Sequence, residues 1–205
     1  MAQTVSTLSQ SRAITATEFI SGNYYLSESE MQNNAELIYF IMYNSYGWTL
    51  EAISGMLGNM ERESTINPGI WESLVEAEES GFGLVQWTPS TNYTDWANNL
   101  GVDITDGWYQ CFWIGEETTE QGQWIETDEY PISFEEFYSS TDSPENLASV
   151  FLKNFERAGV EAEIERQENA RKWYDYLLSV IDGGETPVVP KKKKMPLWMM
   201  CRRLF

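Results

Sequence analysis

Apolar residues recur every three or four positions through most of this chain, and that spacing limits the possible folds more than any other feature. A pattern of this period lays one face of an α-helix against a core. Segments that show it lie near residues 28–47, 49–64, 90–101, 105–117, 143–155 and 170–181. Many of these segments are bounded by capping residues or by glycine. The sequence therefore predicts six or seven helices with little β structure, a mostly α-helical fold of the α+β class.

The two ends of the chain lack this spacing. Residues 1–26 are expected to form a loosely ordered N-terminal arm. A Pro-Val-Val-Pro segment at 187–190 predicts a stiff linker. The residues after it mix six Lys and Arg with apolar and aromatic side chains. We therefore expect one domain over residues 27–184, followed by a linker and a basic, apolar tail over residues 185–205.

The absence of histidine narrows the possible chemistry. With no histidine in 205 residues, Ser-His-Asp triads, Cys-His dyads and histidine zinc helices are excluded. The two cysteines, Cys111 and Cys201, are too few for a four-cysteine zinc site. Acid–base catalysis would then fall mainly to Asp and Glu. Pairs of carboxylates are the groups that glycoside hydrolysis uses.

The charge of the chain is uneven and strongly acidic. Residues 1–150 hold 24 acidic and two basic residues, and the whole chain has a net charge of −19. Such a body repels phosphate backbones, so we expect no nucleic-acid partner. The longest apolar run, at 37–43, has seven residues and is too short for a transmembrane segment. The N-terminal residues lack the apolar core of a signal peptide, so we expect no signal peptide and synthesis in the cytoplasm.

Two carboxylates close the second predicted helix, at Glu61 and Glu63. Glu63 lies three residues after Met60 and seven after Met56, on one border of the apolar stripe, and Glu61 follows Leu57 on the other border. A carboxyl group half-buried there, among apolar side chains and few cations, would favour its protonated form. A glycosidase needs such a group to protonate the leaving oxygen. Periodicity alone does not choose between the two, and both can equally be solvated residues at a helix end.

A longer sequence pattern distinguishes Glu63 from Glu61. The segment GMLGNMERESTINPGIW at 55–71, followed by GFGLVQWTP at 81–89, resembles the phage tail lysozyme family, wall-degrading domains in the tail tips of viruses of Gram-positive bacteria. The Glu-Ser pair and the GxGLxQ segment are also similar to the active-site signature of goose-type lysozymes and lytic transglycosylases. With segments between 123 and 174, the resemblance covers residues 27–180. It implies a lysozyme-like fold with a small β-hairpin region.

The resemblance also implies site residues. It makes Glu63 the catalytic acid and adds the following Ser64 to the substrate-binding residues. The sugar-binding wall falls on the residues that match GxGLxQ, which are Gly81, Gly83, Leu84 and Gln86. Glycines there would let the backbone approach a saccharide, and Gln86 offers both a donor and an acceptor.

No motif marks a second catalytic carboxylate. Glu76, Glu78 and Glu79 lie between the two motifs, where they can either face the cleft or form a solvated acidic loop. Glu156 lies where transglycosylases place an aromatic-polar pair beside the cleft, so we count it among the substrate-binding residues. An ion pair with the neighbouring Arg157 would explain Glu156 equally well.

The function implied by the resemblance is a peptidoglycan-cleaving glycosidase. It would be a muramidase acting between N-acetylmuramic acid and N-acetylglucosamine, carried on a phage tail to open the host wall at infection. The alternatives are a lytic transglycosylase, an endolysin acting at host lysis, or a tail protein that binds glycan without cutting it. No metal or organic cofactor is implied. The expected partners are glycan strands and, through the tail at 185–205, phage tail proteins, with an anionic surface as the alternative for that tail.

Overall fold

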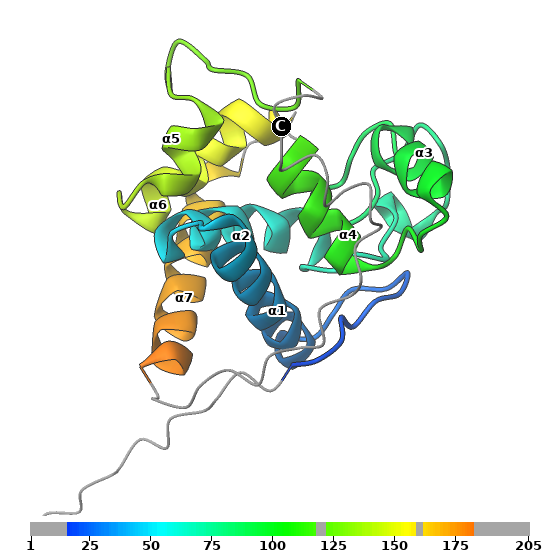
Figure 1. Ribbon diagram of the computed structural model, residues 1–205, viewed down its shortest axis with the longest axis horizontal. Helices are drawn as coiled ribbons and strands as arrows, with labels where there is room; N and C mark the ends of the chain where they lie inside the picture. Colours follow the sequence, from blue (N-terminus) through cyan, green and yellow to red (C-terminus); the bar gives the residue numbers. More distant parts are fainter. Residues whose placement is uncertain (1–15, 118–121, 159–161, 183–205) are drawn as a thin grey trace, which may run out of the picture.

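The computed structural model of the protein describes residues 16–117, 122–158 and 162–182 and is mostly helical, as predicted. The α-helices of these ranges are α1 (Glu28–Tyr46), α2 (Leu50–Ser64), α3 (Thr91–Leu100), α4 (Gly107–Phe112), α5 (Phe134–Ser139), α6 (Pro144–Phe151) and α7 (Glu163–Ile181). The short helices are η1 (Glu72–Leu74), of 3₁₀ type, and the π-helical turns η2 (Trp113–Glu117) and η3 (Leu152–Glu156). Figure 1 shows α3 on one side of the molecule and α5, α6 and α7 on the other, with α1, α2 and α4 between them.

The boundaries of the first two helices follow from local capping. Ser27 and Glu30 form a capping box at the start of α1, and Gly47 ends that helix in the left-handed conformation with φ 72°. Two residues later the side chain of Thr49 accepts a hydrogen bond from the backbone N–H of Ala52 and starts α2. These local signals are why the sequence placed both helices correctly.

The small β-hairpin region that the resemblance implied is reduced to isolated bridges. Within the described ranges no strand is formed, and Phe82 makes one antiparallel bridge to Trp71 and one to Trp87. The backbone turns between them, because Gly83 (φ 77°) and Gln86 (φ 48°) are both left-handed. An extended ladder cannot continue through two such residues. Residues 81–87 thus form a tight loop instead of a hairpin.

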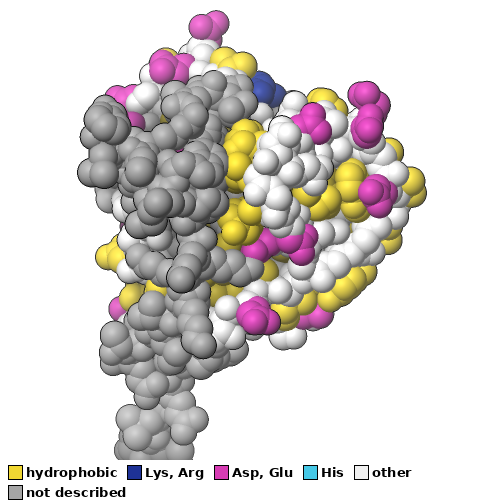
Figure 2. All heavy atoms as spheres, turned by 45° about the vertical axis from the view of Figure 1, so that its right-hand side comes forward, with side chains coloured by type: hydrophobic (Ala, Val, Ile, Leu, Met, Phe, Trp, Pro, Cys, Tyr) yellow, Lys and Arg dark blue, Asp and Glu magenta, His cyan; other side chains and the backbone are white. Residues whose placement is uncertain are grey.

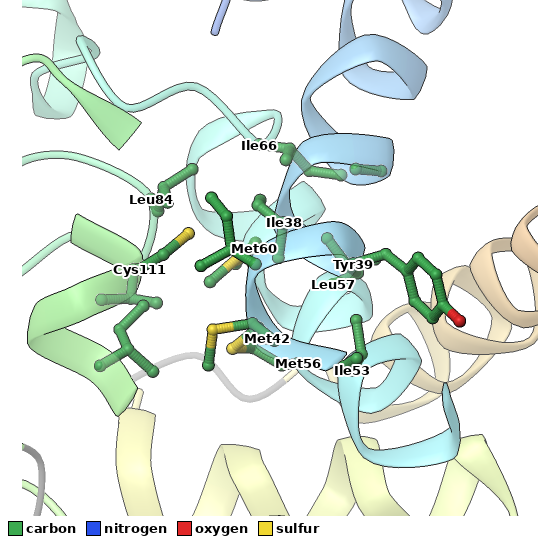
Figure 3. Close-up of a cluster of buried hydrophobic side chains, with 14 of the residues drawn as sticks. Ile38, Tyr39, Met42, Ile53, Met56, Leu57, Met60, Ile66, Leu84 and Cys111 are labelled. Carbon is green, nitrogen blue, oxygen red and sulfur yellow. The ribbon is translucent and has the colours of Figure 1, made fainter. Parts of the chain in front are cut away.

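The core is built around α2, whose inner face is fully buried. Figure 3 shows Met56 and Met60 of α2 beside Met42 of α1, with Leu84 and Cys111 completing the cluster. All five of these side chains are buried. The cluster joins two helices, the tight loop and α4, so the last turn of α2 is held from several directions.

The most extensive helix pairing is that of α7 with α2, and Gly58 makes it possible. A Cβ added at Gly58 would lie 2.7 Å from the backbone nitrogen of Ala170, too close for a real contact. Gly55 does the same for α6, because its Cβ would lie 2.8 Å from the carbonyl carbon of Leu147. Two glycines on α2 therefore set how closely α6 and α7 approach it.

Part of the expected loose arm is ordered. Residues 16–26 are held by side-chain amides rather than by a periodic apolar pattern. Asn34 donates to the carbonyl of Ile20 at 2.7 Å and accepts from its N–H at 2.8 Å. Asn67 donates to the carbonyl of Gly22 at 2.7 Å. Such tertiary hydrogen bonds leave no periodicity in the sequence, which is why the order was not predicted.

The chain ends lie outside the described residues. This applies to residues 1–15 of the arm and to the linker and tail at 185–205. None of the helices that the structure describes is long and apolar enough to cross a membrane.

Replacing Gly58 with alanine should destabilise the fold. The added methyl group must push α7 away from α2, and overpacking of this kind costs roughly 1–3 kcal/mol. Urea unfolding followed by circular dichroism measures the effect. Asn98→Ala, at an exposed position of α3, is the matched control and should change stability by less than about 0.5 kcal/mol. Equal midpoints for the Gly58 variant and the wild type would contradict this account of the packing.

Candidate active site

A cleft of about 660 Å³ lies beside the last turn of α2. Its wall combines that turn with the tight loop, the start of α3, the end of η3 and the first turns of α7. The charged residues that line it are Glu63, Glu72, Glu156, Arg62, Arg157 and Arg166. Three carboxyl groups and three guanidinium groups thus meet in one cavity.

Glu63 lies in the cleft and is bound by a buried arginine. Its Oε1 accepts a hydrogen bond from Nη2 of Arg166 at 2.5 Å, with side-chain exposures of 21% for Glu63 and 2% for Arg166. Arg166 also donates through Nη1 to Oδ1 of Asn59 at 3.1 Å. The expectation of few cations around Glu63 is therefore wrong, because α7 brings Arg166 to it. Arg166 fixes the orientation of the carboxylate at the cleft.

Glu61 has a different environment and does not line the cleft. One of its carboxylate oxygens accepts from Nζ of Lys172 at 2.6 Å, and the other accepts from the indole N–H of Trp173 at 2.7 Å. Both partners belong to α7. The two glutamates that periodicity left equivalent are thus distinguished, since Glu61 ties α2 to α7 and Glu63 faces the cavity.

Glu156, at the end of η3, is the second carboxyl group close to Glu63. Its Oε1 is buried and has no hydrogen-bond partner among the residues that the structure describes. Burial, and next the negative charge of Glu63, raise the pKa of Glu156 well above its ordinary value, against opposing effects from Arg166 and Arg157. An ion pair between Glu156 and Arg157 is not among those of the described residues. The ion-pair alternative for Glu156 is therefore wrong.

The acidic loop between the two motifs stays out of the cavity. Glu76, Glu78 and Glu79 are exposed and do not line the cleft. Glu72 lines it instead, and its Oε2 accepts from the backbone N–H of Gly81 at 3.1 Å. Within the described ranges, no three His, Cys, Asp or Glu side chains are placed to hold a metal ion.

Gln86 and Gly81 both line the cleft. The side-chain amide of Gln86 donates to the carbonyl of Gly83 at 3.0 Å and to that of Ile70 at 3.3 Å, which fixes its orientation. A Cβ at Gly81 would lie 2.8 Å from Oε1 of Gln86. Gly81 therefore leaves room for the Gln86 side chain.

The other three residues of the matched motifs lie behind the cleft wall. Ser64 is buried and donates through Oγ to the carbonyls of Leu84, at 2.8 Å, and Met60, at 2.9 Å. A Cβ at Gly83 would lie 2.6 Å from Oε1 of Gln110, and Gly83 is left-handed. This position therefore needs glycine for the backbone and for Gln110. Ser64, Gly83 and Leu84 join the tight loop to the last turn of α2.

Two residues that support the site were missed in the sequence. Arg166 could have been found from the sequence, because it continues the buried stripe of Ala170, Trp173 and Leu177 on α7. A charged residue on an apolar stripe needs a buried partner. No sequence pattern points to Gln110. It holds the loop by accepting from the N–H of Leu84 at 2.8 Å, a contact that only the tertiary fold creates.

A mostly helical domain whose central helix ends in a glutamate at a cleft is organised like a lysozyme. The profile of the phage tail lysozyme family matches residues 33–177, and the chain belongs to this family. The chain is also 44% identical over 160 residues to "Morphogenesis protein 1" of Bacillus phage B103, a match that covers 78% of this chain and 43% of the relative. The chain thus spans less than half the length of that relative. The resemblance to the phage tail lysozyme family is confirmed, and the protein is a phage-associated, lysozyme-like protein.

Replacing Glu156 with glutamine should stabilise the protein at neutral pH. A carboxyl group with a raised pKa binds its proton more tightly in the folded state, so the wild type loses stability as pH rises above the ordinary value of 4.5 toward the folded pKa. Each pKa unit by which the folded and unfolded states differ changes the free energy of unfolding by about 1.4 kcal/mol. Denaturant unfolding at several pH values should show that Glu156→Gln exceeds the wild type at pH 7 and matches it near pH 4.

Glu135→Gln, at an exposed position of α5, is the control for this measurement. It should follow the wild type at every pH. A stability difference between Glu156→Gln and the wild type that does not change with pH would show that Glu156 has an ordinary pKa.

Proposed function

We propose that the protein is a peptidoglycan-cleaving glycosidase, a muramidase that cuts between N-acetylmuramic acid and N-acetylglucosamine. The observation that carries the proposal is the pair of interacting carboxyl groups in one cleft, Glu63 from α2 and Glu156 from η3. Carboxyl pairs perform both proton donation and charge stabilisation in glycoside cleavage. The family assignment supports the same class of reaction.

In this proposal Glu63 is the proton donor. Burial and the negative charge of Glu63 raise the pKa of Glu156, so Glu156 retains, beside Glu63, a proton that an isolated carboxyl group would have lost. Oε1 of Glu156 is buried, whereas the Glu63 side chain is 21% exposed. Glu63 is therefore the member that can reach the glycosidic oxygen, with its carboxyl group oriented by Arg166.

Once the proton is transferred, the negative charge in the cleft acts on the sugar. The transition state of glycoside cleavage has oxocarbenium character, so it carries positive charge. The anionic form of Glu63, together with Glu72 on the same wall, lowers the energy of that charge. Gln86, held by two backbone carbonyls, is positioned to bind a sugar hydroxyl or acetamido group.

We also propose that the enzyme is carried in the phage tail and opens the wall at infection, with residues 185–205 as the segment that docks on tail proteins. The support is the word "tail" in the family's description and "Morphogenesis" in the relative's name. Mass spectrometry of purified virions tests the location. Detection only in lysed cultures, and not in virions, would favour an endolysin instead.

Glu63→Gln should remove the proton donor. Its amide oxygen can still accept from Arg166, but the buried guanidinium group loses its ion pair, so the thermal unfolding of this variant must be measured together with its activity. Loss of a general acid lowers the rate by roughly 10²–10⁴-fold, measured as the clearing of a suspension of Gram-positive cell walls. Glu61→Gln is the control on the same helix end and should retain most of the activity. Its thermal unfolding must be followed in parallel, because Glu61 binds Lys172 and Trp173.

The products of the digest distinguish the possible reactions. Hydrolysis by a muramidase leaves a reducing end on N-acetylmuramic acid, and a transglycosylase leaves a 1,6-anhydro ring at that position. Activity of Glu63→Gln above half of the wild-type rate would refute the assignment of Glu63. Glycan binding without any cleavage by the wild type would refute the proposed enzyme.

A further inference from the structure

One cation of the described chain has no acidic partner, although the protein is strongly acidic. Lys and Arg are scarce among the acidic side chains on the face shown in Figure 2. Six Lys and Arg lie in the described ranges, and five of them have a carboxylate oxygen within 4.0 Å. These five are Arg62, Lys153, Arg166, Arg171 and Lys172. Arg157 is the sixth, and it forms no ion pair with any described residue.

Arg157 lines the cleft and is held in a defined position there. Its Nη1 donates to the backbone carbonyls of Gln123, at 2.6 Å, and Asn154, at 2.8 Å. A guanidinium group has five N–H donors, and these bonds use those of one nitrogen alone. Arg157 also ends the π-helical turn η3 in the left-handed conformation, with φ 49°. Left-handed residues other than glycine and π-helical turns both concentrate at functional sites.

We propose that Arg157 binds a carboxylate of the peptidoglycan strand and so selects muramyl-containing strands over neutral polymers of N-acetylglucosamine. This inference rests on the proposed function, since it concerns the substrate of the same cleft. Guanidinium and carboxylate groups pair through two parallel hydrogen bonds with defined geometry. The two sources of a carboxylate on such a strand are the lactyl group of muramic acid and the peptide attached to it.

The overall charge of the protein favours a local cation at the site where such a strand binds. A body with a net charge of −19 repels a polymer that carries carboxylates. The other two cleft arginines are already paired, Arg62 with Glu165 at 3.1 Å and Arg166 with Glu63. Arg157 is therefore the cleft cation whose charge is available to a substrate. Arg157 lines the same cleft as Glu63 and its charge acts on Glu156, so a carboxylate bound at Arg157 would lie in the cleft that holds the proposed proton donor.

Binding measurements on three ligands test the inference. The ligands are neutral N-acetylglucosamine oligomers, teichoic-acid-free glycan strands stripped of peptide, and the same strands with intact peptides. Isothermal calorimetry gives the Kd of the full chain carrying Glu63→Gln, so that strands are not cut. Arg157→Met is compared with Arg171→Met, which removes the same charge from a residue outside the cleft that pairs with Glu145.

Arg157→Met should raise the Kd for carboxylate-bearing strands roughly 10–100-fold, the usual effect of losing a charge-assisted hydrogen bond. The Kd for neutral oligomers should stay within about twofold, and Arg171→Met should change neither. An effect confined to stripped strands identifies the lactyl carboxylate as the ligand. An effect confined to peptide-bearing strands identifies the peptide.

An equal loss for neutral and charged ligands would overturn the inference, since Arg157 would then only hold the segment around Gln123 in place. No loss for either ligand would also overturn it. The result is separable from the fate of the proposed function. If the wild type binds charged strands selectively but cuts no glycan, the role of Arg157 stands and the glycosidase is refuted. If it cuts glycan without charge selectivity, the glycosidase stands and the role of Arg157 is refuted.

Discussion

The close packing of α7 on α2 at Gly58 is the constraint on which the site depends. It brings Arg166 into the interior beside Glu63, where the Arg166 side chain is 2% exposed. A buried charge is costly unless it is paired and hydrogen-bonded, and Glu63 and Asn59 provide those contacts. Glu61 stabilises the same pair of helices, because its carboxylate accepts hydrogen bonds from Lys172 and Trp173 of α7. The helix that stabilises the core therefore also positions the candidate catalytic carboxylate.

The second half of the site comes from the π-helical turn η3. This turn places Glu156 and Arg157, two neighbours of opposite charge, on the wall of one cleft without pairing them. Asn154 anchors the turn by donating to the carbonyl of Tyr130 at 2.9 Å. Glu156 has a buried Oε1 and feels the negative charge of Glu63, so it favours its protonated form. Arg157 keeps a charge that forms no ion pair with any described carboxylate. The cleft thus combines a group that retains a proton with a group that can bind an anion.

The sequence predicted what local signals encode. Helix ends such as those set by Ser27 and Thr49 follow from capping residues, and the family motifs led to Glu63 and Gln86, which both line the cleft. Tertiary contacts could not be predicted from these local signals. The left-handed turn at Gln86 replaced the expected hairpin, because a non-glycine residue gives no warning of a positive φ.

The motif residues behind the wall illustrate the same limit. Ser64 and Gly83 match the family signature, yet the structure places them against Leu84 and Gln110 rather than in the cavity. A sequence motif indicates that a residue is needed. Only the structure shows whether that residue contacts the cavity or supports its wall. Arg166 was the opposite case, since it matched no motif and lies at the centre of the site.

The central claim is that Glu63 and Glu156 interact in this cleft, where the negative charge of Glu63 helps to raise the pKa of Glu156. Carbon-13 NMR of the glutamate carboxyl groups tests this claim most directly. A titration of the wild type should show one side-chain carboxyl, assigned to Glu156 by its absence in Glu156→Gln, with a pKa well above the ordinary value. In Glu63→Gln the pKa of Glu156 should fall, because the negative charge that helps to raise it is gone. A Glu156 carboxyl that titrates in the ordinary range, or one that does not respond to Glu63→Gln, would contradict the account.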